Sequence, residues 1–115
     1  MTETVIDQGI FAELKEMAGA EFINELIDTF LAEAPLMLVD LQKGLANGDA
    51  ELFRRAAHSL KSNSLTFGAL GLGELGRELE ALGRDNQLAR VGDRLAVLSA
   101  EYGRVALALK GLRDE

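Results

Sequence analysis

The stretch Arg54-Arg55-Ala56-Ala57-His58-Ser59-Leu60-Lys61-Ser62-Asn63-Ser64 decides how this chain is organised, and it holds the only histidine among the 115 residues. Around it, apolar side chains recur at spacings of three and four, as on the buried face of a helix; they are Phe53, Ala56, Ala57, Leu60 and Phe67. At about 100° per residue, His58 lies roughly 150° from the centre of that stripe. The pattern therefore predicts a helix that presents one imidazole to solvent.

The composition favours a single soluble domain spanning residues 1–115. Apolar residues make up 48% of the chain and charged residues 27%, which suits a protein with its own core rather than a disordered one. No apolar run approaches the length of about 18 residues that spans a membrane, and the first residues lack the basic segment of a signal peptide. Because cysteine is also absent, we expect a cytoplasmic protein that does not associate with membranes.

The charge distribution excludes one class of partner and suggests another. The net charge of −7 argues against nucleic-acid binding, because such proteins usually carry the opposite sign. Arg54, Arg55 and Lys61 nevertheless flank His58. A local cationic spot on an acidic body suits a small anionic group such as a phosphoryl, and a partner with its own charge pattern.

Hydrophobic spacing in the first half of the chain predicts a series of helices. We expect a short first helix capped by Asp7 and a second amphipathic helix over about 22–33. A new helix should begin near Pro35, because proline is tolerated at the first position of a helix. The pair Asn47-Gly48 then predicts a left-handed stop.

The second half continues the helical pattern. The His58 helix should start after an N-cap at Asp49 and end near residue 66, before a break at Gly68. Two further helices are expected, over about 72–83 and over 88–112, the last being the longest. No segment alternates with period two, so we predict an all-α fold. Long amphipathic helices with short loops favour an antiparallel four-helix bundle with a short additional N-terminal helix as a cover.

The residues around His58 suit phosphoryl chemistry. Arg54 and Lys61 lie on the same helix face as His58, at positions i−4 and i+3, and the small Ser62 at i+4 leaves space beside the ring. A neutral imidazole is a nucleophile near physiological pH. Transfer of a phosphoryl group depends mainly on positioning and positive charge. An exposed site favours transfer to and from an outside protein over hydrolysis.

These residues carry a family resemblance. The pattern Arg55-x-Ala57-His58-x-Leu60-Lys61-Ser62, followed by Phe67-Gly68-Ala69 and Leu79-Glu80, resembles the histidine-containing phosphotransfer (HPt) domain. The resemblance covers nearly the whole chain. It implies a four-helix bundle whose exposed histidine accepts a phosphoryl group from the aspartate of a receiver domain and passes it to another receiver.

The resemblance also implies roles for single residues. His58 would be phosphorylated, through Nε2, and Lys61 would lie near the phosphoryl oxygens. Glu80 matches the position of a Gln or Glu beside the ring, where it would accept a hydrogen bond from Nδ1–H and fix the tautomer. The alternative for Glu80 is an ordinary surface acid paired with Arg84. Ser62 departs from the usual glycine of the family, which affects partner preference and transfer rate more than the activity itself.

The docking surface expected from the sequence comprises Arg54, Arg55, Ser62 and Leu65. An exposed Leu65 would give a receiver an apolar contact on the His58 face. The alternative is that Leu65 packs against the first helix, through Ile10, Phe11 or Leu14.

Other patterns in the chain favour neither a nucleotide site nor a metal site. The sequence 71–76 matches G-x-G-x-x-G, but a helix precedes it where that fingerprint needs a strand. Glycines that let this helix pack close to the His58 helix explain it better. One histidine without cysteine makes a metal site improbable, and we expect no cofactor, with any Mg²⁺ held by the partner receiver.

The sequence therefore predicts a monomeric carrier without kinase activity of its own, since the chain has no room for an ATP-binding domain. The expected partners are response-regulator receiver domains, among them one carried by a hybrid histidine kinase. Two other classes stay open. One is a helical binding module that sequesters a signalling partner without being phosphorylated. The other is an enzyme or metal protein built in a bundle, which would need a buried polar cluster that the apolar core positions do not offer.

Overall fold

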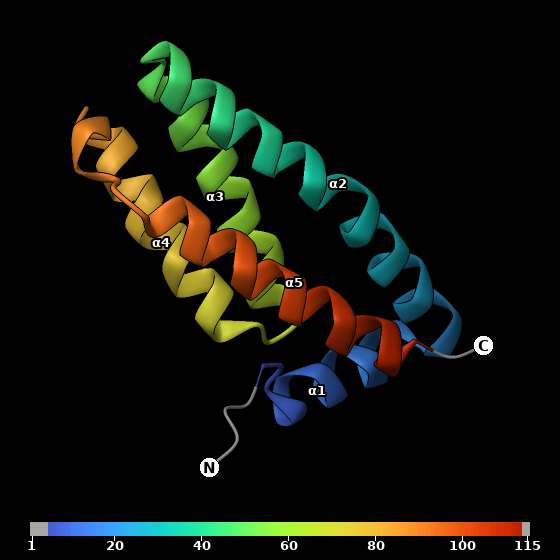
Figure 1. Ribbon diagram of the computed structural model, residues 1–115. Helices are drawn as coiled ribbons and strands as arrows, with labels where there is room; N and C mark the ends of the chain where they lie inside the picture. Colours follow the sequence, from blue (N-terminus) through green and yellow to red (C-terminus); the bar gives the residue numbers. More distant parts are fainter. Residues whose placement is uncertain (1–4, 114–115) are drawn as a thin grey trace.

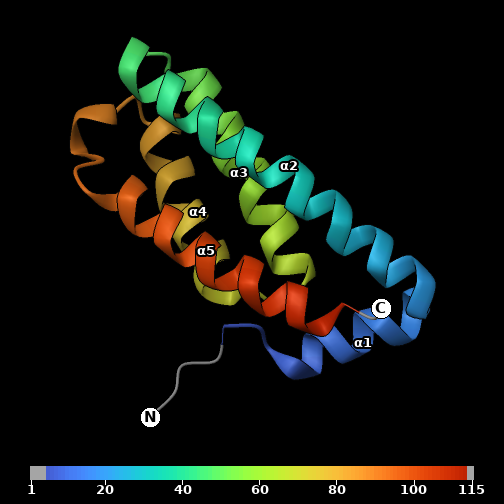
Figure 2. The same cartoon turned by 45° about the vertical axis from the view of Figure 1, so that its right-hand side comes forward.

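The computed structural model describes residues 5–113, which form helices and no strand. Four long helices make an antiparallel bundle, and a short first helix lies at one end of it (Figures 1 and 2). In chain order the helices are α1 (Gln8–Ala18), α2 (Ala20–Asn47), α3 (Ala50–Thr66), α4 (Leu70–Arg84) and α5 (Arg94–Leu112). The predicted fold class, an antiparallel four-helix bundle with a short N-terminal helix, is confirmed.

The predicted helix break at Pro35 is wrong. α2 runs without interruption through Pro35, which is exposed and lies inside the helix. A proline there removes one backbone donor. The apolar face of α2 continues on both sides of it, with Phe30, Ala34 and Leu41 all buried. Packing of that face outweighs the local cost, because tertiary contacts supply most of the stability of a helix in a protein.

The predicted start of the last helix is also wrong. Leu88–Arg90 form a short 3₁₀ turn, and α5 begins only at Arg94. Between them, Gly92 adopts a left-handed conformation with a φ of +56°. The chain therefore turns at Gly92 before α5 begins. The last helix was expected to be the longest, but α5 has 19 residues whereas the uninterrupted α2 has 28.

The signals that delimit α3 were predicted correctly. The Asp49 side chain accepts a hydrogen bond from the backbone N–H of Leu52 at 3.0 Å and caps the helix. Gly48 ends α2 in a left-handed conformation, and Gly68 follows α3 with a φ of +83°. The predicted core face of α3 is buried, at 0–7% exposure, and consists of Phe53, Ala56, Ala57, Leu60 and Phe67.

Two glycines bring α4 close to α3. A Cβ atom on Gly83 would lie 3.0 Å from the backbone nitrogen of Arg54, and Gly76 is similarly tight against α3. The glycines of the G-x-G-x-x-G match thus lie in α4 itself, and Gly73 and Gly76 face α3. Packing of α4 on α3 explains these two, as the sequence suggested, whereas Gly71 lies against Glu101 of α5. Glu80 lies between Gly76 and Gly83 on α4, so this close approach carries its side chain toward α3.

Candidate functional site

His58 projects from the outer face of α3. Its side chain is 52% exposed, while the neighbouring Ala57 and Leu60 are fully buried. The amphipathic pattern of α3 causes this orientation, because burial of the apolar face turns the opposite face to solvent. The imidazole is therefore held on a rigid helix and stays accessible to another protein.

The Glu80 carboxylate binds the ring on one side. Its Oε2 atom lies 2.8 Å from Nδ1 of His58. A carboxylate can only accept a hydrogen bond, so this contact places the ring proton on Nδ1. The other ring nitrogen, Nε2, is then left with a free lone pair, which is the nucleophilic form of imidazole.

Glu80 also binds Lys61. The second carboxylate oxygen, Oε1, lies 2.7 Å from the Lys61 ammonium, and the Glu80 side chain is only 19% exposed. Partial burial raises the pKa of Glu80, but the hydrogen bonds from Lys61 and from His58 together lower it by more, so the pKa lies below its ordinary value. Glu80 therefore stays ionised and joins α3 to α4 at the site.

The alternative for Glu80, a surface ion pair with Arg84, is not what the structure contains. The Arg84 guanidinium instead pairs with Asp85, with Nε 3.1 Å from Oδ1. The pairing of Glu80 with Lys61 was not predicted. It depends on how α3 and α4 are aligned side by side, which no spacing within one helix reveals.

The cations predicted around His58 are largely neutralised by acids. Arg54 makes two hydrogen bonds to Glu51, at 3.0 and 2.7 Å, and Arg55 lies 3.9 Å from the same carboxylate. These contacts follow from the i,i+3 and i,i+4 spacing of Glu51 with the two arginines, a signal present in the sequence. Arg55 remains the most open of the group, with 66% of its side chain exposed.

Ser62 and Leu65 both lie on the exposed surface of α3. Leu65 is 43% exposed, and its side chain extends over Gly73 of α4, where a Cβ atom would come within 2.5 Å of it. The structure thus places Arg54, Arg55, Ser62 and Leu65 on the same helix as His58. Their docking role stays a prediction.

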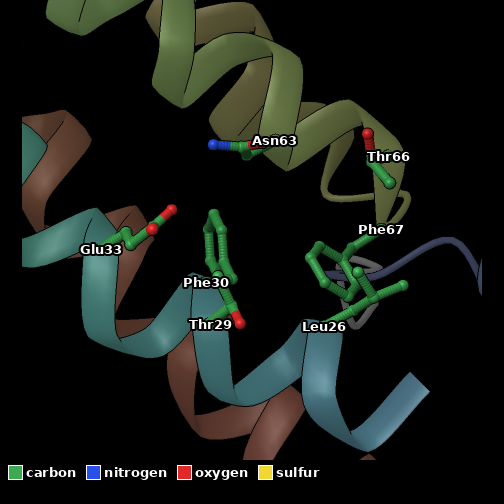
Figure 3. Close-up of a pocket in the computed structure, with 7 residues that line it drawn as sticks. All are labelled: Leu26, Thr29, Phe30, Glu33, Asn63, Thr66 and Phe67. Carbon is green, nitrogen blue, oxygen red and sulfur yellow. The ribbon is translucent and has the colours of Figure 1, made fainter. Parts of the chain in front are cut away.

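A small hollow of about 90 Å³ opens between α2 and α3. Figure 3 shows Glu33 and Phe30 of α2 opposite Asn63 of α3, with Leu26 and Phe67 at the other end of the hollow. His58 does not line it. The hollow is far smaller than a pocket for a nucleotide, for which several hundred Å³ are typical.

Across residues 5–113, no three or more His, Cys, Asp or Glu side chains gather in a way that could hold a metal ion. In the same part of the chain, every helix is too short or too polar to cross a bilayer.

Comparisons with known proteins agree with this geometry. A family model described as Hpt domain matches residues 25–113. The crystal structure of histidine-containing phosphotransfer protein B (HptB) from Pseudomonas aeruginosa PAO1 is similar, with a TM-score of 0.89 and 30% sequence identity. The match covers 97% of this chain and 96% of that one. A comparison with curated proteins finds no significant match.

Proposed function

The chain belongs to the Hpt domain family, and from this premise we propose that His58 carries a phosphoryl group between receiver domains of a multi-step phosphorelay. His58 would accept the group from the phosphorylated aspartate of one receiver and pass it to the aspartate of another. The observation that carries the proposal is the exposed imidazole whose Nδ1 contacts Glu80 at 2.8 Å.

The transfer step uses the free lone pair of Nε2. This lone pair attacks the phosphorus of the aspartyl phosphate while the bond from phosphorus to the carboxyl oxygen breaks. The aspartate leaves as a carboxylate, and the new N–P bond holds the phosphoryl group. The Nδ1 proton remains on the ring, hydrogen-bonded to Glu80. Return of the group to a second receiver reverses these bond changes.

Lys61 supplies positive charge beside the reacting group. Its ammonium lies 2.7 Å from Glu80, and 24% of its side chain is exposed. Since three phosphoryl oxygens carry the negative charge in the transition state, a nearby cation stabilises it. Arg54 and Arg55 add positive charge on the same helix, reduced by their contacts with Glu51.

The partner supplies everything else that the reaction needs. We propose that Mg²⁺ belongs to the receiver, and that receivers, including one from a hybrid histidine kinase, dock over Arg54, Arg55, Ser62 and Leu65. The domain would act as a monomer in the cytoplasm. It would be a covalent carrier with no kinase activity of its own, because each phosphoryl group must come from a partner.

Label transfer from a phosphorylated receiver domain in the presence of Mg²⁺ tests the proposal. Wild type should acquire an acid-labile, base-stable label, and His58→Gln should acquire none. Ser59→Ala, a change at the neighbouring exposed residue of α3, is the matched control and should label normally. Normal labelling of His58→Gln would overturn the assignment. Receiver binding by both proteins without any label would favour a module that sequesters its partner.

A further inference from the structure

The Glu80 carboxylate is shared between the ring and a cation. One oxygen is 2.8 Å from Nδ1 of His58 and the other is 2.7 Å from Nζ of Lys61. An uncharged amide would be enough to accept one hydrogen bond and fix the tautomer. The negative charge of Glu80 therefore has an effect beyond orienting the ring, and that effect is largest when the ring itself is positively charged.

Phosphorylation creates such a positively charged ring. When Nε2 of the Nδ1–H tautomer bonds to phosphorus, both ring nitrogens are substituted and the ring becomes an imidazolium. We propose that the charge of Glu80 keeps the Nδ1 proton on phosphorylated His58 at neutral pH, and so keeps the phosphoryl group ready to leave. This inference rests on the proposed function, because it concerns the phosphorylated state of His58.

The leaving group explains why the proton matters. In the next transfer an oxygen of the acceptor attacks phosphorus, the N–P bond breaks, and its electron pair returns to Nε2. With the Nδ1 proton present, a neutral imidazole leaves. Without that proton, the leaving group would be an imidazolate anion, which is a far poorer one. Retention of the proton thus determines how fast the carrier releases its phosphoryl group.

The structure holds the carboxylate in the required place. Lys61 binds Oε1, which leaves Oε2 directed at the ring. Gly76 and Gly83, on either side of Glu80, keep α4 close to α3. Glu80 is also only 19% exposed, so solvent screens its charge less than that of a surface acid.

Lys61, which binds the same carboxylate, is the cation of the site, and further charged groups lie on the surrounding helices. On α3 they are Glu51, Arg54 and Arg55, of which the first two form a tight pair with each other. On α4, Arg84 is engaged by Asp85. Among residues 5–113, Glu80 is the acid that hydrogen-bonds to the ring.

The experiment measures the lifetime of phosphorylated His58 against pH. Wild type and Glu80→Gln are phosphorylated chemically with phosphoramidate, which needs no receiver, and phosphorus NMR follows the loss of the N–P signal. Gln keeps the size of the side chain and a hydrogen-bond acceptor but removes the charge. The matched control is Glu74→Gln, which removes an exposed acid from the same helix.

A negative charge within hydrogen-bond distance of a cationic ring, as Glu80 is of His58, raises the pH at which that ring loses its proton by about one unit or more. The midpoint at which hydrolysis slows should therefore lie about one unit lower in Glu80→Gln than in wild type, and hydrolysis above both midpoints should be about tenfold slower. Glu74→Gln should follow wild type. Transfer to a receiver should slow in parallel with hydrolysis.

Two results would overturn the inference, and they are distinguishable. If both proteins are phosphorylated on His58 and their profiles coincide, the charge of Glu80 has no such effect, while the proposed function stands. If wild type takes no phosphoryl group on His58 from either phosphoramidate or a phosphorylated receiver, the proposed function fails as well. Circular dichroism of each variant shows that the bundle is folded during the measurement.

Discussion

Gly76 packs directly against the backbone of Lys61: a Cβ atom at position 76 would lie 3.2 Å from both Cα and Cβ of Lys61. The carbonyl oxygen of Ala57 would be 3.3 Å away. These contacts are with the backbone and the first side-chain atom of α3, which cannot rotate aside. The distance between α3 and α4, and with it the reach of Glu80 toward His58, therefore depends on the absence of a side chain at position 76.

We predict that Gly76→Val lowers the free energy of unfolding by about 2 kcal/mol, because overpacking a tight contact typically costs 1–3 kcal/mol. Denaturant unfolding measures it. Gly103→Val is the matched control, since a Cβ at position 103 of α5 meets nothing within 4 Å; its stability should change by no more than about 0.5 kcal/mol. Equal stability of the two variants would show that α3 and α4 can separate without cost.

Lys61→Ala should slow phosphoryl transfer from a receiver by about tenfold or more, because removal of a group that stabilises transition-state charge has effects of this size or larger. The bundle should stay folded, since the side chain is partly exposed. Rapid-quench measurement of label transfer gives the rate, with Lys43→Ala on the exposed surface of α2 as the control. An unchanged rate would remove Lys61 from the mechanism.

The stability of the bundle should depend on pH through Glu80. In the folded protein the pKa of Glu80 lies below its ordinary value, owing to Lys61 and His58 acting against partial burial. The unfolded state then binds more protons between the two pKa values, so stability rises with pH through that range. The contribution is complete above the unfolded-state pKa of about 4.3 and is lost as the pH falls through the folded-state value.

Denaturant unfolding of wild type and Glu80→Gln between pH 7 and pH 3 tests this dependence. The stability advantage of wild type should be largest near neutral pH and should shrink below about pH 4.3, where the carboxyl becomes protonated in the unfolded chain. A difference that stays constant across the whole range would mean that the ion pair contributes nothing to folding.

Ser62→Phe should weaken receiver docking, because a large ring at this exposed position crowds His58 one helical turn away. We expect at least a tenfold rise in Kd, measured by isothermal titration calorimetry with an unphosphorylated receiver; this size is typical for disrupting a central contact. Ala100→Phe, on the exposed side of α5, is the control. If Ser62→Phe binds as tightly as wild type, the receiver docks elsewhere.

Much of the fold followed from local patterns. The exposure of His58 opposite Ala57 and Leu60 was predicted because a helix places residues at fixed angles. The cap at Asp49 and the turn at Gly68 have direct chemical signals. The prediction at Pro35 was wrong because it relied on a local signal alone. Proline is typical of a helix start, but the apolar face of α2 continues through Pro35 and keeps the helix intact.

The site was predictable only in part. The contact of Glu80 with His58 was expected from the family pattern, whereas its contact with Lys61 requires the alignment of α3 and α4. That alignment depends on Gly76 and Gly83, and only Gly76 belongs to the G-x-G-x-x-G match in the sequence. The pairing of Arg54 with Glu51 could have been found, because an acid three residues before an arginine is a recognisable helical pair.

His58, Lys61 and Glu80 all lie inside helices rather than on loops. Among residues 5–113 the imidazole is already exposed, so a partner can reach it without rearrangement of these helices. How often a receiver reaches His58 would then depend on how often the molecules meet, and the chemistry at His58 would set the rate within each encounter. Two receivers competing for the same histidine would share it according to their concentrations and encounter rates, and the cell could redirect the signal simply by making more of one.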